Sequence, residues 1–198
     1  MKHLKSWSRP IQVADPLKIM NGRLNVAEQI NGFEVMQKQV HDCSVLSALA
    51  VAAHHEMKTN YQTRLISGNI YPQDKYGNPI YNPAGKYVVK MFVNGAWRAI
   101  TIDDYFPRSK YESWTCAFSQ AGKLWVNILE KAYLKLHGGY EFTGSCSSRD
   151  LYVLTGWLPE VVKIAKTPDV NGLWHKILQG TKTRDCLITL GTDVIPDE

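Results

Sequence analysis

The stretch QKQVHDCSVLSALAVAAHHEM, residues 37–57, places a single cysteine at the start of an apolar, alanine-rich run. From Cys43 to about Met57, apolar side chains recur at intervals of three and four residues, which predicts an α-helix. Asp42 directly precedes this run and is expected to cap the helix. The pattern therefore predicts that Cys43 lies in the first turn of a helix that packs in the core.

Two interpretations of Cys43 follow from that position. Free cysteines are among the most often buried residues, so Cys43 fits a small core side chain. The free N–H groups and the dipole of a helix start also favour a thiolate, which is the form that attacks carbonyl carbons. Gln37 lies upstream in a predicted loop, and its amide is able to donate a hydrogen bond to an oxyanion beside the sulfur. These residues alone leave both interpretations open.

The remaining segments predict a mixed, α+β fold. Two β-rich runs flank Asn94-Gly95, a dipeptide typical of a type I′ turn, and predict a hairpin over residues 87–102. A helix with one apolar face is predicted for residues 124–137, before Gly138-Gly139 ends it. The run CLITL, residues 186–190, is predicted to be a buried strand.

Two further helices are predicted toward the C-terminus. One begins near Ser147, with Asp150 three residues later as a capping-box-like partner. The other covers residues 172–180, carries its apolar side chains on one side and is expected to stop at Gly180. Helices are therefore expected to dominate the fold.

The composition is that of an ordinary folded domain, and it excludes several functional classes. Of the 198 residues, 44% are hydrophobic and 21% are charged, with a net charge of +5. Lys and Arg are scattered without a basic block interleaved with aromatic residues, so no nucleic-acid partner is expected. The longest apolar run is too short for a membrane span, and no secretory signal opens the chain. A cytoplasmic protein is predicted.

The cysteines do not form a metal-binding or disulfide pattern. Cys43, Cys116, Cys146 and Cys186 are widely separated, with no CxxC pair and no Cys/His pairing at metal-ligand spacing. In a reducing compartment they are expected to be free thiols. No metal site and no cofactor are therefore expected.

Three segments of the chain resemble the calpain family of cysteine proteases. HDCSVLSALA, residues 41–50, resembles the nucleophile segment of this family, in which Asp-Cys opens the central helix. GKYVVKMFVNGAWRAITIDDYFP, residues 85–107, resembles the calpain hairpin, which ends in an Ile-Asp-Asp-x-x-Pro run. LWVNILEKAYLKLHGGYEFTGSCSSRDLYVLTGW, residues 124–157, is similar to the calpain stretch built on Leu-x-Glu-Lys-Ala-Tyr, a Gly-rich loop and Leu-Thr-Gly. The order and approximate spacing of the three agree.

The resemblance implies a papain-like fold and a function in limited proteolysis of protein or peptide substrates. It makes Cys43 the nucleophile, and Gln37 with the Cys43 backbone N–H the oxyanion hole. It also implies a division into an N-terminal lead segment, residues 1–32, and a protease core, residues 33–198. That core is the first lobe, which bears the cysteine and is mainly helical with a β-hairpin.

Departures from the conventional pattern resemble the PalB-like branch, whose members lack calcium-binding EF-hands. Conventional calpains usually carry Gly before Asp-Cys and Trp after it, where this chain has His41 and Ser44. Lys38 stands where many calpains have Gly. This loop belongs to the region that responds to calcium in conventional members, so calcium dependence is doubtful. The branch also implies endosomal-sorting partners, bound through domains outside these residues.

A papain-type mechanism needs two groups that this sequence does not supply. A His must hold the thiolate and protonate the leaving amine, and an Asn or Asp must orient that ring. No Gly-His-Ala-Tyr-like or Asn-Pro-Trp-like segment occurs in the chain, and no His follows His175. His54 and His55 are interpreted as a solvated helix end, and His175 as a structural residue. The catalytic His and Asn are expected in a second, β-rich lobe beyond these residues, so the chain alone is predicted to be inactive.

Asp103 and Asp104 form an acidic pair, and one hypothesis is that they are paired catalytic carboxylates. They are adjacent at a predicted strand end, so their side chains are expected to diverge. Turn chemistry is the better interpretation of this pair.

Two functional hypotheses remain from the sequence. In the first, these residues belong to an intracellular calpain-like endopeptidase that cleaves by thiolate acyl transfer. In the second, the chain is a catalytically silent calpain relative that binds substrates or partners without cutting them. A transglutaminase-like enzyme is a weaker third alternative, because it does not explain the hairpin and Leu-Thr-Gly resemblances.

Overall fold

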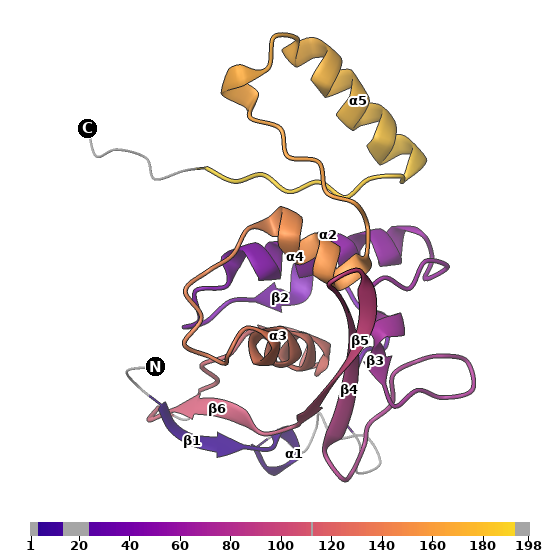
Figure 1. The fold of residues 1–198 in the computed structure, drawn as a ribbon. Helices are drawn as coiled ribbons and strands as arrows, with labels where there is room; N and C mark the ends of the chain where they lie inside the picture. The colour runs from indigo at the N-terminus through magenta and orange to yellow at the C-terminus, as the bar shows by residue number, and fades with distance from the viewer. Residues whose placement is uncertain (1–3, 14–23, 112, 193–198) are drawn as a thin grey trace.

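The computed structural model of the chain describes residues 4–13, 24–111 and 113–192 (Figure 1). Helices and small antiparallel sheets are mixed along it, which confirms the predicted α+β class. In chain order the elements are β1 (Leu4–Ser8), α1 (Pro10–Val13), η2 (Gly32–Glu34), β2 (Val35–Met36), α2 (Cys43–Lys58), η3 (Ser67–Asn69), β3 (Ile70–Tyr71), β4 (Lys86–Val93), β5 (Ala96–Asp103), β6 (Phe106–Ser109), β7 (Phe118–Ser119), α3 (Trp125–Leu136), α4 (Ser147–Thr155), η4 (Ile164–Lys166) and α5 (Val170–Thr183).

Helix α2 forms where its apolar periodicity predicted it. Val45, Leu46, Leu49 and Ala53 are all buried, and they follow the predicted spacing of three and four residues. The helix packs against α4, and it also contacts η2 and β2. Its first residue, Cys43, therefore sits on a scaffold that the core holds in place.

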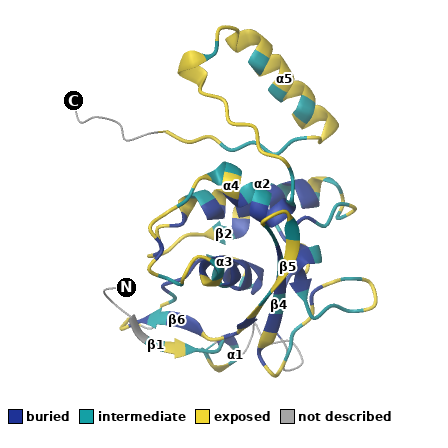
Figure 2. Ribbon diagram, viewed as in Figure 1, coloured by how far each residue is buried: buried dark blue, intermediate teal, exposed yellow. Residues whose placement is uncertain are grey.

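Helix α3 lies at the centre of the molecule, between α2 and α4 on one side and the β4–β5 hairpin on another (Figure 1). Figure 2 shows buried residues along its length and on the elements that surround it. The buried face is wider than the predicted one, because Val126, Leu134 and even Glu130 are buried beside the predicted side chains. The helix contacts neighbours on several sides, so only a narrow face, which includes Lys135, is left exposed.

The predicted hairpin is confirmed, with β4 and β5 paired antiparallel from Lys86↔Asp103 to Val93↔Ala96. Asn94 and Gly95 connect the strands with φ angles of 51° and 75°. Positive φ at both central residues is the requirement of a type I′ turn, which is why Asn-Gly is informative. Strand β3 adds to the other edge of β4 to complete a three-stranded sheet.

Replacing Gly95 with alanine is expected to lower the free energy of unfolding by about 1 kcal/mol. A Cβ at this position would meet no atom within 4 Å, so the cost comes from the left-handed backbone alone. Equilibrium urea denaturation of the two proteins measures the difference. A loss near zero would contradict the turn geometry.

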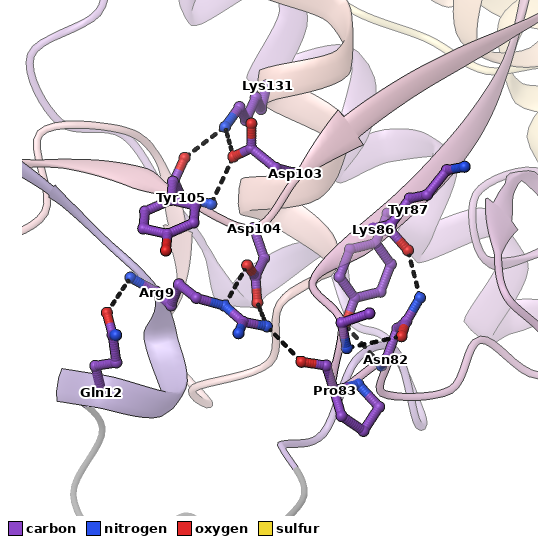
Figure 3. Close-up of polar contacts among 11 residues, drawn as sticks. Arg9, Gln12, Asn82, Pro83, Lys86, Tyr87, Asp103, Asp104, Tyr105 and Lys131 are labelled. Carbon is purple, nitrogen blue, oxygen red and sulfur yellow. Dashed lines mark hydrogen bonds and ion pairs between the residues drawn. The ribbon is translucent and has the colours of Figure 1, made fainter.

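The N-terminal segment is attached to the core through β1 and a partly buried ion pair. Strand β1 pairs antiparallel with β6, and Arg9 follows it. Arg9 Nε and Nη2 donate to the two carboxylate oxygens of Asp104 at 2.7 and 3.0 Å (Figure 3). Asp103 instead accepts from Lys131 Nζ at 2.6 Å and from the Tyr105 backbone N–H. The two aspartates therefore diverge into structural roles, as predicted.

Beyond α4 the chain leaves the core, and Figure 1 shows α5 standing apart from the other helices. The predicted helix is confirmed, but it continues through Gly180 and ends at Thr183, so Gly180 does not stop it. None of its residues is buried. Residues 186–190 form no strand and none of them is buried, which makes that prediction wrong. No strand of the described part of the chain lies beside this segment to complete a ladder.

The helices also bear on membrane insertion. In residues 4–13, 24–111 and 113–192, no helix combines the length and the apolar character that crossing a bilayer requires. The longest of these helices, α2, has 16 residues.

Candidate active site

Cys43 is the first residue of α2, and its side chain is exposed. The helix begins with the bond from the Leu46 N–H to the Asp42 carbonyl at 3.0 Å. The N–H groups of the first turn have no partner within the helix, and they form a positive end that stabilises nearby negative charge. The structure therefore excludes the interpretation of Cys43 as a core residue and presents its sulfur to solvent.

Asp42 occupies the predicted cap position but does not cap the helix with its side chain. That expectation was wrong, because the Asp42 side chain is fully buried and turned toward the core. There burial raises its pKa, and the nearby Glu130 of α3 acts in the opposite direction through hydrogen bonding. The residue directly before the cysteine is therefore fixed to the central helix rather than to its own first turn.

The side-chain amide of Gln37 is bonded within its own loop. Its Nε2 donates to the Val40 carbonyl at 2.9 Å and to Asp42 Oδ1 at 3.4 Å. Both N–H bonds of the amide are thus used, although the group lies against the residue that precedes Cys43. An oxyanion beside the sulfur would receive a Gln37 N–H only after one of these bonds opens.

Glu130 is the other member of the buried carboxyl pair. Its Oε1 accepts from the Ala117 backbone N–H at 2.8 Å, and the residue is fully buried. Burial, followed by the charge of Asp42, raises the pKa of Glu130 well above its usual range. Burial likewise raises the pKa of Asp42, to about 6.

A second polar network reaches the residue that follows the cysteine. Ser44 and Ser145 hydroxyls are hydrogen-bonded at 2.8 Å, and Ser145 Oγ also donates to Asp150 Oδ2 at 2.8 Å. Tyr133 of α3 donates to Asp150 Oδ1 at 2.6 Å. The predicted capping role of Asp150 was wrong, since α4 has no side-chain cap and Asp150 is buried in this network. Cys43 is therefore flanked on both sides by residues tied to α3.

The other three cysteines have different surroundings. Cys116 is buried, and that burial raises the pKa of its thiol. Cys146 is exposed, and a hydrogen bond with Ser148 lowers the pKa of its thiol. Burial raises the pKa of the Cys186 thiol. Within the described residues, no group of three or more His, Cys, Asp or Glu side chains is arranged to hold a metal ion.

Three histidines, His54, His55 and His175, make contacts away from Cys43. The interpretation of His55 as part of a solvated helix end was wrong, because this residue is buried. Its ring lies edge-on to Trp157, and its Nε2 contacts the Arg184 carbonyl oxygen at 2.9 Å. His54 stands edge-on to Phe33. Exposed His175 has its Nδ1 2.8 Å from the carbonyl of Asn171. None of these three contacts involves the cysteine.

Comparison with known proteins decides the family. The profile described as "Calpain family cysteine protease" matches residues 1–197. The chain belongs to the calpain family. It is 40% identical over 172 residues, 85% of its length, to Calpain-7 of Homo sapiens. It is 34% identical over 197 residues, 96% of its length, to the Calpain-like protease palB/RIM13 of Aspergillus oryzae.

These calpain relatives are much longer than this chain. The matched region covers 21% of human Calpain-7 and 22% of the Aspergillus protein. A third relative, the Calpain-like protease palB/cpr-8 of Neurospora crassa, is 34% identical, and 20% of its length is matched. The predicted resemblance to the calpain family and to its PalB-like members is confirmed.

The sequence interpretation missed two residues of the site, Glu130 and Asp150. Glu130 stands four residues after Val126 and four before Leu134, so apolar side chains flank it on its own helix face. An acidic residue at such a position is a signal for a buried, partnered carboxyl group. Asp150 carried no comparable signal, because a helix-start position explains an acidic residue equally well.

Proposed function

We propose that this chain is the cysteine-bearing lobe of a calpain-like cysteine endopeptidase, in which Cys43 is the nucleophile. The observation that carries the proposal is the exposure of Cys43 at the first turn of a helix packed in the core, in a chain of the calpain family. In the proposed reaction Cys43 Sγ attacks a peptide carbonyl carbon, the amine leaves, and water then hydrolyses the thioester.

The oxyanion and the protons need further groups. Gln37 and the Cys43 backbone N–H stabilise the tetrahedral oxyanion once the Gln37 amide has turned from its own loop. A His, oriented by an Asn, takes the thiol proton and donates one to the leaving amine. These two residues belong to a second lobe outside residues 1–198, and residues 33–198 are the first lobe after a lead segment, residues 1–32.

Labelling with an epoxysuccinyl peptide tests the proposal in the natural full-length protein. Such a probe alkylates thiols that an enzyme has activated, so it is expected to modify Cys43 and to stop cleavage of an unfolded protein substrate in the same proportion. Mass spectrometry of the proteolytic peptides identifies the modified cysteine. Modification of Cys146 in place of Cys43, with equal loss of cleavage, would refute the assignment.

A second candidate function is a catalytically silent binding module. Two observations favour it: the Gln37 amide is already bonded, and large apolar side chains are exposed after α4, among them Leu158, Trp174 and Leu190. Such a protein would bind the epoxysuccinyl peptide without covalent modification of Cys43. The labelling experiment therefore separates the two functions.

The setting of the protein is part of the proposal. Proteolysis in this family implies protein substrates. The proposed acyl transfer uses only a thiol and needs no cofactor. A cytoplasmic location, independence of calcium and endosomal-sorting partners remain predictions.

A further inference from the structure

Two buried carboxyl groups lie on the core side of the residue that precedes Cys43. The proposed thiol reaction does not use either of them. Asp42 and Glu130 are both fully buried, and after the larger effect of burial each carboxyl group acts on the pKa of the other. Within the described residues, Asp42 Oδ2 and Glu130 Oε2 accept no hydrogen bond from an N–H or hydroxyl group. Two neighbouring buried carboxyl groups whose free oxygens receive no donor repel each other when both are charged, so we place one proton between them.

The surroundings place that proton on Glu130. Asp42 Oδ1 receives an N–H of Gln37, and Asp42 stands at the positive end of α2, so both contacts favour its charged form. Glu130 lies deeper, and its one further partner is the Ala117 N–H. Its pKa is raised well above the usual range, first by burial and then by the charge of Asp42. At neutral pH Glu130 therefore donates to an ionised Asp42.

We propose that Glu130 is a positioning residue for the reaction of Cys43, because its protonated carboxyl group holds Asp42 and, through Asp42, both the Gln37 amide and the start of α2. The inference rests on the proposed function, since it assigns a role in aligning that nucleophile. One bond from the central helix α3 thus fixes both the residue beside the sulfur and the candidate oxyanion donor.

The arrangement has a consequence at alkaline pH. Loss of the Glu130 proton leaves two negative charges in one buried site, and their repulsion displaces Asp42 and with it the start of α2. The titratable groups around the pair do not compensate for this charge. They are Asp150 of α4, Cys116 before β7, Tyr140 after α3, Lys131 on α3 and Asp103 on β5, and of these only Lys131 is cationic, bonded to Asp103.

The Glu130→Gln variant tests the inference, because glutamine keeps the shape and donates an N–H to Asp42 without a titratable proton. Two rates are measured from roughly pH 5 to roughly pH 9 in the natural full-length protein. The first is kcat/KM for peptide cleavage, and the second is alkylation of Cys43 by iodoacetamide, resolved by mass spectrometry. At neutral pH the variant and wild-type rates are expected to agree within about twofold. At alkaline pH the ratio of the variant rate to the wild-type rate is expected to rise, because only the wild-type protein loses the Glu130 proton.

Further variants separate a positioning role from a purely structural one. Glu130→Ala leaves Asp42 buried without its partner and is expected to lower both rates by about tenfold to a hundredfold at neutral pH, a loss that Gln restores. Glu160→Gln, at an exposed carboxylate paired with Lys176, is the matched control and is expected to leave both profiles unchanged.

Each outcome decides one of the two proposals. A Glu130→Gln ratio that is flat across pH in both assays would overturn the positioning role, even where Cys43 remains essential for cleavage. Cleavage that continues without Cys43 would overturn the proposed function instead, and the alkylation ratio would still report on Glu130.

Discussion

Replacing Cys43 with alanine in the natural full-length protein is expected to lower peptide-bond cleavage by at least about a thousandfold. In the proposed reaction Cys43 Sγ is the atom that forms the acyl intermediate, and no other thiol stands at the start of α2. The variant is expected to fold normally, because the Cys43 side chain is exposed and fills no part of the core. Cleavage of an unfolded protein substrate measures the effect.

The matched control is Cys146→Ala, which removes the other exposed thiol. A hydrogen bond lowers the pKa of Cys146, so this residue is the alternative nucleophile on chemical grounds. Its replacement is expected to leave cleavage within about twofold of wild type. Loss of cleavage in this variant, with retention in Cys43→Ala, would reverse the assignment of the two cysteines.

The largest effect on stability is expected from Glu56→Ala, a loss of about 3–5 kcal/mol in the free energy of unfolding. Glu56 is fully buried near the end of α2. Its Oε2 accepts from the backbone N–H groups of Ile66 and Ser67 at 2.9 and 3.1 Å, and its Oε1 accepts from the Ser67 hydroxyl. Alanine would leave all three donors buried without an acceptor, which costs more than the bonds themselves contribute.

Urea denaturation, followed by circular dichroism, measures this loss. Glu160→Ala is the control of the same chemistry: Glu160 is exposed and paired with Lys176 at 2.8 Å, so its loss is expected to cost about 0.5 kcal/mol or less. Similar midpoints for the two variants would contradict the role of Glu56 as the acceptor for the loop that follows α2.

Local patterns were sufficient to predict the elements that position the site. The α2 helix was predictable because its apolar spacing records the face that meets the core, and the hairpin because Asn94-Gly95 suits positive φ at both turn residues. The Cys43 position followed from the same helix. In each case the decisive interaction lies within about a dozen residues of sequence.

Features that depend on distant neighbours were not predictable in the same way. Asp42 fits a helix cap by its position, but a buried partner from α3 draws its side chain inward. His55 has the sequence position of a solvated helix end, yet Trp157 and Arg184 from beyond α4 cover it. Residues 186–190 have the composition of a strand, but composition does not provide the neighbouring strand that a ladder needs.

With Gln37 as the proposed oxyanion donor, its bond to the Val40 carbonyl would divide the resting site into closed and open forms. A single hydrogen bond of about 1 kcal/mol leaves roughly one molecule in six open at 25 °C. In the proposed reaction, turnover would then equal the intrinsic rate multiplied by that open share. A ligand that bound only the open form could therefore raise the rate by no more than about sixfold, which sets the ceiling for activation through this loop.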